Sequence, residues 1–354
     1  MNAQFTQHNL IFKQASGTSR GVLTTKETYL LEISKNDKKG IGECAIFRGL
    51  SYDDVPDYEE KLTWLCENIH SDFEVLKKEL LHYPSIIFGL EQALLNLQHG
   101  EDLYFPSDFT DGKDSIKING LIWMGNADFM QSQIEEKLAK GFDCIKLKIG
   151  VDWKSEKEII KKLREKFPKE QLELRVDANG AFSYEEATIV LQELADLGIH
   201  SIEQPIKKSE VRSPKSEENS EKKSTDCCIP WNKMARLCAE TPTPIALDEE
   251  LIGIIDFEEK KKLLETIKPQ YIILKPALVG GFSGSDEWIA IAESLGINWW
   301  ITSALESNIG LNAICQYTYT KKNPLPQGLG TGALFTNNFE THLQLEGDQM
   351  WHKK

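Results

Sequence analysis

The sequence lacks an excess of basic residues: 55 aspartates and glutamates outnumber 41 lysines and arginines, and the formal net charge is −14. That balance excludes a general nucleic-acid-binding protein, because phosphate contacts require clustered basic side chains. No apolar run approaches the ~18 residues of a membrane-spanning helix, so we expect no membrane insertion. The first residues lack a basic segment followed by an apolar stretch, which predicts no signal peptide.

The cysteines offer no metal-binding or redox motif, because none of the seven lies in a C-x-x-C pattern. Their odd number and the vicinal pair at 227–228 argue against a disulfide framework and predict free thiols in the cytoplasm. What the sequence does contain is ordinary for a globular protein: 354 residues, 40% hydrophobic and 27% charged. This length predicts two domains, or one barrel with an appended domain.

The N-terminal part, residues 1–112, is expected to form an α+β domain. Apolar residues in the segments 28–34 and 40–47 predict two strands of a hairpin. Leucines at helical spacing then predict helices, the last of which ends at Gly100. We expect a C-terminal tail of about residues 336–354 to pack with this domain.

From residue 113 to 335 the pattern changes to strands that alternate with helices. This alternation predicts a parallel (β/α) barrel rather than an open sheet. The expected strands are 115–122, 144–150, 172–178, 200–205, 244–250, 271–277, 297–304 and 327–332. The interval between the fourth and fifth strands is long because residues 207–228, rich in Ser, Lys and Glu, are inserted there. Their composition predicts a disordered loop.

Three carboxylates end successive strands: Asp177, Glu203 and Asp248. A single acid at such a position is often only a helix N-cap. The active site of a barrel lies at the carboxyl ends of its strands, however, and three carboxylates that converge there repel one another unless they bind a cation or a proton. A site of oxygen ligands without Cys or His suits Mg²⁺ or Mn²⁺ rather than zinc.

Three lysines are expected in the same place. Lys146 and Lys148 share one face of a strand whose alternate residues are apolar, so both should point into the barrel, and Lys275 ends the sixth strand. Burial and nearby cations lower the pKa of a lysine, which makes it a usable general base. The expected chemistry is removal of a proton α to a carboxylate, with a divalent cation that stabilises the enediolate.

These motifs resemble the enolase superfamily, and within it the muconate lactonizing enzyme subgroup. The matching segments are K-x-K at 146–148, VDANGAF at 176–182, SIEQP at 201–205, ALDEE at 246–250 and ILKP at 273–276. The resemblance implies an α+β capping domain followed by a modified (β/α)7β barrel. It also implies that two capping segments, 16–26 and 47–54, close the site.

Within the subgroup the sequence is most similar to the o-succinylbenzoate synthase family, through the segments 118–125, 246–253, 303–316 and 328–339. This similarity implies Mg²⁺ on the three carboxylates, with Mn²⁺ as a substitute. It implies syn dehydration of 2-succinyl-6-hydroxy-2,4-cyclohexadiene-1-carboxylate in menaquinone biosynthesis. Lys148 would remove the α proton and then assist departure of hydroxide, Lys275 would stabilise the developing charge, and Lys146 would bind the substrate carboxylate.

Further polar residues are expected around the substrate. Those predicted to contact it are Asn119, Ser303, Gly330 and Thr331. Asn179 shares a face with the first carboxylate and should support it from behind. Glu249 directly follows the third carboxylate, so strand periodicity predicts that it points away from the site.

Two alternatives stay open at this point. A dipeptide epimerase or N-acylamino acid racemase would use the same charged residues, with the two lysines on opposite faces of the substrate as acid and base. A barrel without catalytic activity is disfavoured, because buried charges have little structural use. The expected partner is a small carboxylate substrate, with neither nucleic acid nor membrane, and the chain is expected to be a monomer or a homodimer.

Overall fold

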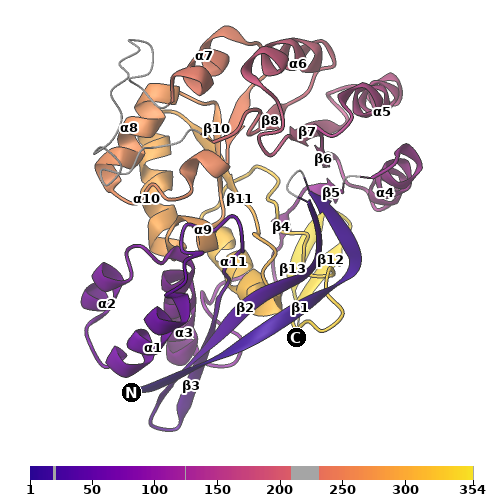
Figure 1. Ribbon diagram of the computed structural model, residues 1–354. Helices are drawn as coiled ribbons and strands as arrows, with labels where there is room; N and C mark the ends of the chain where they lie inside the picture. Colours follow the sequence, from indigo (N-terminus) through magenta and orange to yellow (C-terminus); the bar gives the residue numbers. More distant parts are fainter. Residues whose placement is uncertain (19–20, 124, 209–230, 354) are drawn as a thin grey trace, which may run out of the picture.

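The computed structural model describes residues 1–18, 21–123, 125–208 and 231–353 (Figure 1). The predicted insertion at 207–228 therefore lies outside the described residues from 209 onward. The five cysteines of the described chain are free thiols, as expected. In the described part of the chain, no helix is both long and apolar enough to cross a membrane.

The N-terminal part contains an antiparallel sheet in the order β1-β2-β3 with three helices packed on it. Its elements are β1 (Asn2–Thr18), β2 (Gly21–Lys35), β3 (Lys38–Cys44), α1 (Tyr58–Asn68), α2 (Phe73–Glu79) and α3 (Pro84–His99). Helix α3 lies very close to β3: a Cβ on Gly42 would come within 2.0 Å of the carbonyl oxygen of Gly89. Glycine at both positions therefore allows the backbones to approach.

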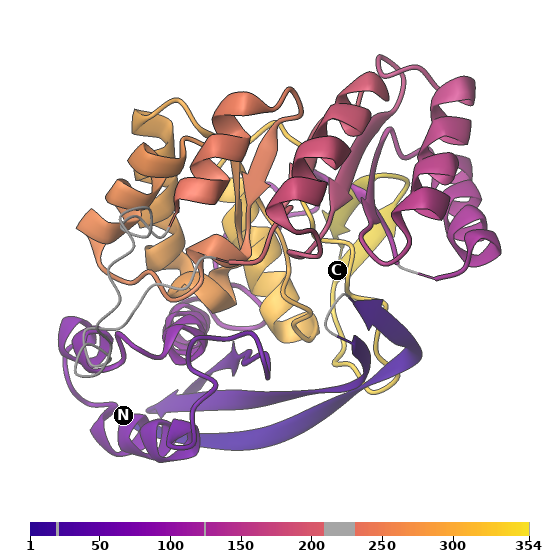
Figure 2. The ribbon, with the colours of Figure 1, turned by 45° about the horizontal axis from the view of Figure 1, so that its top comes forward.

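Strand β1 was not predicted, whereas β2 contains the predicted strand 28–34 and β3 overlaps the predicted strand 40–47. It pairs with β2 along a two-stranded ribbon, and most of its side chains are at least partly exposed. A strand with little buried surface shows no clear apolar alternation, which explains the omission. Figure 2 shows this ribbon running beneath the barrel towards the C-terminal end of the chain.

The second part is a curled parallel sheet whose seven strands are neighbours in chain order. The strands are β5 (Gly120–Ile122), β6 (Cys144–Lys148), β7 (Glu173–Asp177), β8 (Ser201–Glu203), β9 (Ile245–Leu247), β10 (Tyr271–Leu274) and β11 (Asn298–Ile301). The predicted eighth strand is reduced to isolated parallel bridges, Thr302 with Gly328 and Ile118 with Gln327. These bridges join the last strand to the first, and the predicted barrel class is confirmed.

Helices cover the outside of this sheet (Figure 1). They are α4 (Ala127–Ala139), α5 (Trp153–Lys166), α6 (Tyr184–Asp196), α7 (Asn232–Glu240), α8 (Phe257–Ile267), α10 (Gly281–Ser294) and α11 (Asn308–Thr320), with the short helices η2 (Glu249–Leu251) and α9 (Pro276–Val279) between strand and helix. The core between sheet and helices is built from the outward apolar residues of each strand, such as Ile145, Leu147 and Val176.

A third sheet holds the C-terminal residues. It is antiparallel, with β12 (Leu343–Glu346), β13 (Gln349–His352) and β4 (Ile116–Lys117) in that order. Before this hairpin, Phe335 bridges to Phe12, and the Asn337 side chain accepts a hydrogen bond from the backbone of Ile11. The tail thus contacts both the capping ribbon and the start of the barrel, and the division of the chain at residue 112 stays a prediction.

Candidate active site

The predicted acids and lysines meet at one end of the barrel because their strands are in register. Lys148, Asp177 and Glu203 are the last residues of β6, β7 and β8, and they are direct neighbours across the parallel pairs. Asp248 and Lys275 each follow the last residue of a strand, β9 and β10. Side chains that leave adjacent strands at the same level necessarily crowd together.

The three carboxylates are almost completely buried, with Asp177 1% exposed and Glu203 and Asp248 each 2% exposed. Burial, together with the charge of Asp177, raises the pKa of Glu203 to about 7. Burial also raises the pKa of Asp248. The pKa of Asp177 is lowered, because attraction to Lys148 and Lys146 outweighs the opposing effect of burial.

The shortest contact of each lysine is with a different carboxylate. Lys148 Nζ lies 2.9 Å from Asp177 Oδ2, and Lys146 Nζ lies 2.6 Å from Glu203 Oε2 and 3.5 Å from Asp177 Oδ2. Lys275 Nζ donates to Asp248 and lies 3.8 Å from Glu203 Oε1. The lysines therefore surround the acids, as their strand positions predicted.

The expected lowering of the lysine pKa values depends on a bound cation and stays a prediction; the protein's own groups raise the pKa of Lys146 and Lys275. Burial does lower the pKa of both side chains, but attraction to Glu203 for Lys146, and to Asp248 and Glu203 for Lys275, raises it by more. Among the protein's own groups, contact with a carboxylate at ion-pair distance therefore has a stronger effect on these two lysines than burial.

Asn179 connects Lys148 to the rim of the site. Its Oδ1 accepts a hydrogen bond of 2.6 Å from Lys148 Nζ, and its Nδ2 donates to Glu249 Oε1 at 3.1 Å. Its backbone N–H donates to Asp177 Oδ1. Asn179 thus holds both the lysine and the carboxylate in place, which is the supporting position expected for it.

The expectation that Glu249 points away from the site is wrong. Strand β9 ends at Leu247, and Glu249 begins the 3-10 helix η2, so the alternation of a strand no longer applies. The side chain is 6% exposed and lies against Asn179.

Sequence reasoning also missed Gln204, whose Oε1 accepts hydrogen bonds from the backbone N–H groups of Asp248 and Glu250. Its backbone has a φ of 41°, a left-handed conformation uncommon for a residue with a side chain. The available signal in the sequence was an amide residue directly after a strand-end carboxylate, within the segment SIEQP. Gln204 fixes the turn from β9 into η2 and so positions Asp248.

The site opens into a cavity of about 460 Å³. Nine predicted residues line it: Asn119, Lys146, Lys148, Asp177, Asn179, Lys275, Ser303, Gly330 and Thr331. Unpredicted lining residues of the barrel include Leu121 and Trp123. A cavity of this size is typical of a small-molecule site.

The capping domain supplies one wall of this cavity, through residues 22–23 and 47–50. Segment 16–26, expected to close the site, is in its described part the end of the β1–β2 ribbon, paired from Ser16 with Leu23 to Thr18 with Gly21. In segment 47–54, Arg48 lines the cavity and pairs with Asp54 at 2.8 Å and with Glu27.

The side chains of Ser303 and Thr331 form a hydrogen bond with each other at the cavity wall. The Thr331 hydroxyl donates to Ser303 Oγ at 2.8 Å, and Ser303 Oγ donates to Glu306 Oε2 at 2.6 Å. Ser303 Oγ also accepts from the backbone N–H of Leu305. The fully buried Glu306 was not predicted, although it lies in the same sequence segment.

Comparisons with known proteins agree with this geometry. The family model described as enolase C-terminal domain-like matches residues 130–216 and 226–349, and the model of the MenC N-terminal domain matches residues 3–97. An o-succinylbenzoate synthase of Desulfotalea psychrophila is 41% identical over 98% of both chains. The crystal structure of MenC from that organism covers 99% of both chains with a TM-score of 0.83 and 39% identity.

More distant relatives share the fold. An L-Ala-D/L-Glu epimerase of Bacillus subtilis is 26% identical over 60% of this chain and 52% of its own. An o-succinylbenzoate synthase structure from Thermosynechococcus elongatus, complexed with Mg, has a TM-score of 0.71 at 21% identity and covers 95% of this chain and 96% of its own. The chain belongs to the o-succinylbenzoate synthase family of the enolase superfamily.

Proposed function

We propose that the protein is an o-succinylbenzoate synthase, a lyase that dehydrates 2-succinyl-6-hydroxy-2,4-cyclohexadiene-1-carboxylate to o-succinylbenzoate in menaquinone biosynthesis. The observation that carries this proposal is a full-length relative of 41% identity, together with six charged residues gathered at one end of the barrel. A cytoplasmic location and a monomeric or homodimeric state remain predictions from the sequence.

Asp177, Glu203 and Asp248 would hold the divalent cation, with Mg²⁺ as the expected ion and Mn²⁺ as a substitute. Their donors are all carboxylate oxygens, and Glu203 Oε1 is buried without a hydrogen-bond donor among the described residues. Such a set fits a hard cation. When bound, the cation supplies positive charge next to the substrate carboxylate and so makes its α proton more acidic.

Lys148 would carry the proton transfer. As a neutral amine it would take the α proton of the substrate, and as an ammonium it would return a proton to the departing hydroxide on the same face of the ring. Loss of water in this way converts the cyclohexadiene into an aromatic ring. Lys148 Nζ donates hydrogen bonds to Asn179 and Asp177, and these support the role because they hold the amine at the cavity.

Lys275 and Lys146 would stabilise charge. Lys275 follows β10, four strands away from β6 in the curled sheet, so it would face the opposite side of the substrate from Lys148. There its ammonium would stabilise the enediolate and the forming ring. Lys146 would donate a hydrogen bond to the substrate carboxylate.

Asn119, Gly330 and Thr331 would contact the substrate, and their place in the cavity wall supports this. Ser303 would act differently, because its hydroxyl already donates to Glu306 and accepts from Thr331 and Leu305. It would hold Thr331 in position rather than donate to the succinyl group.

An epimerase or racemase activity on dipeptides or acylated amino acids is the second candidate. It is favoured by the placement of Lys148 and Lys275 on opposite sides of one cavity and by the similarity to the Bacillus subtilis epimerase. In that reaction one lysine would remove the α proton and the other would return a proton to the opposite face.

The test is turnover of the cyclohexadiene substrate by the purified protein with Mg²⁺, followed by ultraviolet absorbance. We expect rapid loss of the diene signal, which stops on chelation and returns when Mg²⁺ is added. Folded, metal-bound protein without turnover would contradict the synthase function. Exchange of the α proton of a dipeptide in D₂O would then support the epimerase.

A further inference from the structure

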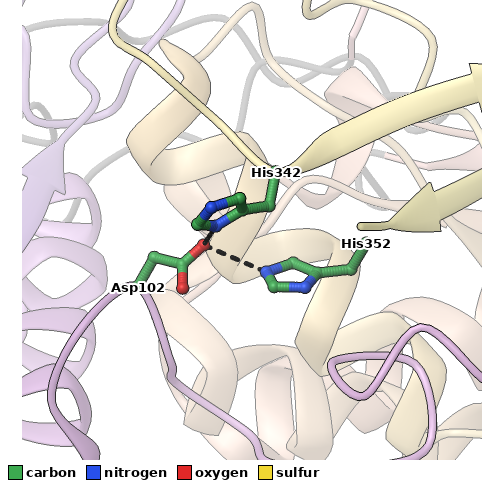
Figure 3. A group of neighbouring side chains, drawn as sticks. All are labelled: Asp102, His342 and His352. Atoms are coloured by element: carbon green, nitrogen blue, oxygen red, sulfur yellow. Dashed lines mark hydrogen bonds and ion pairs between the residues drawn. The ribbon is translucent and has the colours of Figure 1, made fainter. Parts of the chain in front are cut away.

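A second group of potential metal ligands lies away from the cavity. Asp102 follows α3 in the connection between the two parts of the chain, His342 precedes β12, and His352 ends β13 (Figure 3). His342 Nδ1 lies 2.6 Å and His352 Nε2 lies 3.0 Å from the same oxygen, Asp102 Oδ2. One potential ligand atom of each residue lies within 4.8 Å of the others. None of the three lines the active-site cavity.

Both sides of this cluster are held by the fold. The two histidines stand at the open end of one hairpin, where Leu343 pairs with His352 and the backbone N–H of Lys353 donates to the His342 carbonyl. The carbonyl of Asp102 accepts hydrogen bonds from the side chains of Asn312 (2.9 Å) and Gln316 (2.8 Å) in α11. The ligand atoms are therefore brought together by secondary structure before any ion binds.

Two buried polar atoms of the cluster have no hydrogen-bond partner among the described residues. Asp102 Oδ1 is buried and receives no hydrogen bond from the described residues. His352 is fully buried, its Nδ1 has no hydrogen-bond partner among the described residues, and its Nε2 faces Asp102, where a bound metal ion would displace the proton that the two groups share.

We propose that Asp102, His342 and His352 form a transition-metal site, for which Zn²⁺ is the expected ion. Two imidazoles and a carboxylate suit zinc, whereas the oxygen donors of the active site suit Mg²⁺. Ligand atoms around tetrahedral zinc are about 3.3 Å apart, so small movements from the present 2.6 and 3.0 Å would admit the ion. The partly exposed side of His342 leaves room for water as a fourth ligand.

The ion would join the connection between the two parts of the chain to the C-terminal hairpin. It would act on stability rather than on turnover. The two kinds of site can be measured separately because they prefer different ions, and saturating Mg²⁺ keeps the active site occupied while Zn²⁺ is titrated.

The experiment is calorimetric titration of the full chain with Zn²⁺ in the presence of excess Mg²⁺. His342→Gln is the test variant, because glutamine can still donate a hydrogen bond to Asp102 but is a poor zinc ligand. His70→Gln, at an exposed histidine elsewhere, is the matched control. Asp177→Asn removes an active-site carboxylate and leaves the proposed zinc site intact.

We expect one Zn²⁺ to bind to the wild type, to His70→Gln and to Asp177→Asn, and the affinity of His342→Gln to be at least tenfold weaker. Zn²⁺ should raise the Tm of the wild type and leave that of His342→Gln unchanged. The proposal is overturned if His342→Gln binds as tightly as the wild type, if the wild type binds no Zn²⁺ beside Mg²⁺, or if Asp177→Asn loses the ion. Because His352 is fully buried and its variants could fail to fold, the partly exposed His342 carries the test.

Discussion

Buried charges have different surroundings at the two ends of the barrel interior, although strand β7 supplies a charged residue to each end. In β7, Arg175 and Asp177 point to the same inner face two residues apart, and each is 1% exposed. Arg175 Nε lies 2.7 Å from Glu173, its Nη1 donates to the carbonyl of Pro326, and its guanidinium lies 4.2 Å from the ring centroid of Trp300. Asp177 instead lies in a group of three carboxylates and three lysines.

The two ends therefore contribute differently: the Arg175 end to stability and the Asp177 end to the reaction. At the Arg175 end, one cation meets one carboxylate, a carbonyl and an aromatic ring, an arrangement that holds the strands together. At the Asp177 end, like charges are crowded and Glu203 has a pKa raised to about 7, which costs stability unless a cation joins them. In barrels the carboxyl end of the strands carries the chemistry, and the opposite end contributes to stability.

The largest expected effect would be at the carboxyl end. Lys148→Ala should lower kcat by at least about 10³-fold, because it removes the amine that Asn179 and Asp177 hold at the cavity as the proposed base. Steady-state assays with saturating Mg²⁺ measure this. Lys161→Ala, at an exposed position of α5, is the control and should keep full activity. Appreciable turnover by folded Lys148→Ala would remove Lys148 from its role as the base.

The comparison itself is tested by Arg175→Met and Asp177→Asn. Arg175→Met should lower the free energy of unfolding by about 3 kcal/mol, because it leaves the Glu173 carboxylate and the Pro326 carbonyl without their donor. Asp177→Asn should abolish turnover with a much smaller loss of stability, since Lys148 keeps its hydrogen bond to Asn179 and the loss of attraction to the lysines is offset by relief of repulsion with Glu203. Urea unfolding in chelator and a turnover assay give both quantities. Equal losses of stability in the two variants would contradict the division between the two ends.

A smaller effect is expected for Ser303→Ala. If Ser303 only holds Thr331, its loss should raise KM several-fold and change kcat little, because the hydrogen bonds to Glu306 and Thr331 are removed while the lysines and acids stay in place. Steady-state kinetics separates the two constants. A loss in kcat as large as that of Lys148→Ala would show that the hydroxyl touches the reacting atoms.

The smallest effect is expected at a buried carboxylate outside the active site, Glu91 of α3, which extends the comparison. Its oxygens accept from the backbone N–H groups of Phe282 and Ser283, and burial raises its pKa to about 7. Because the folded protein holds this proton more tightly than the unfolded chain, its contribution to stability falls as the pH rises from about 4.5 to about 7. Glu91→Gln should flatten this dependence in urea unfolding measured across that range. An unchanged slope would mean that folding does not raise the pKa of Glu91.

Much of the site could be predicted because strand geometry carries over from sequence to structure. Alternation placed Lys146 and Lys148 on the inner face, and the barrel pattern placed three carboxylates at one end. The prediction failed where the chain leaves the strand, as at Glu249, or where a side chain acts on the backbone of another segment, as Gln204 does. Strand β1 was missed because most of its side chains are at least partly exposed.

By itself, then, the sequence determined the class of fold, the acids and lysines of the site, and through its motifs the family. Only the tertiary structure decided which lysine contacts which carboxylate, since cross-strand register sets those distances. It also brought Asp102 next to His342 and His352, more than two hundred residues away in the chain. Contacts over such separations depend on how whole elements pack, which local periodicity does not encode.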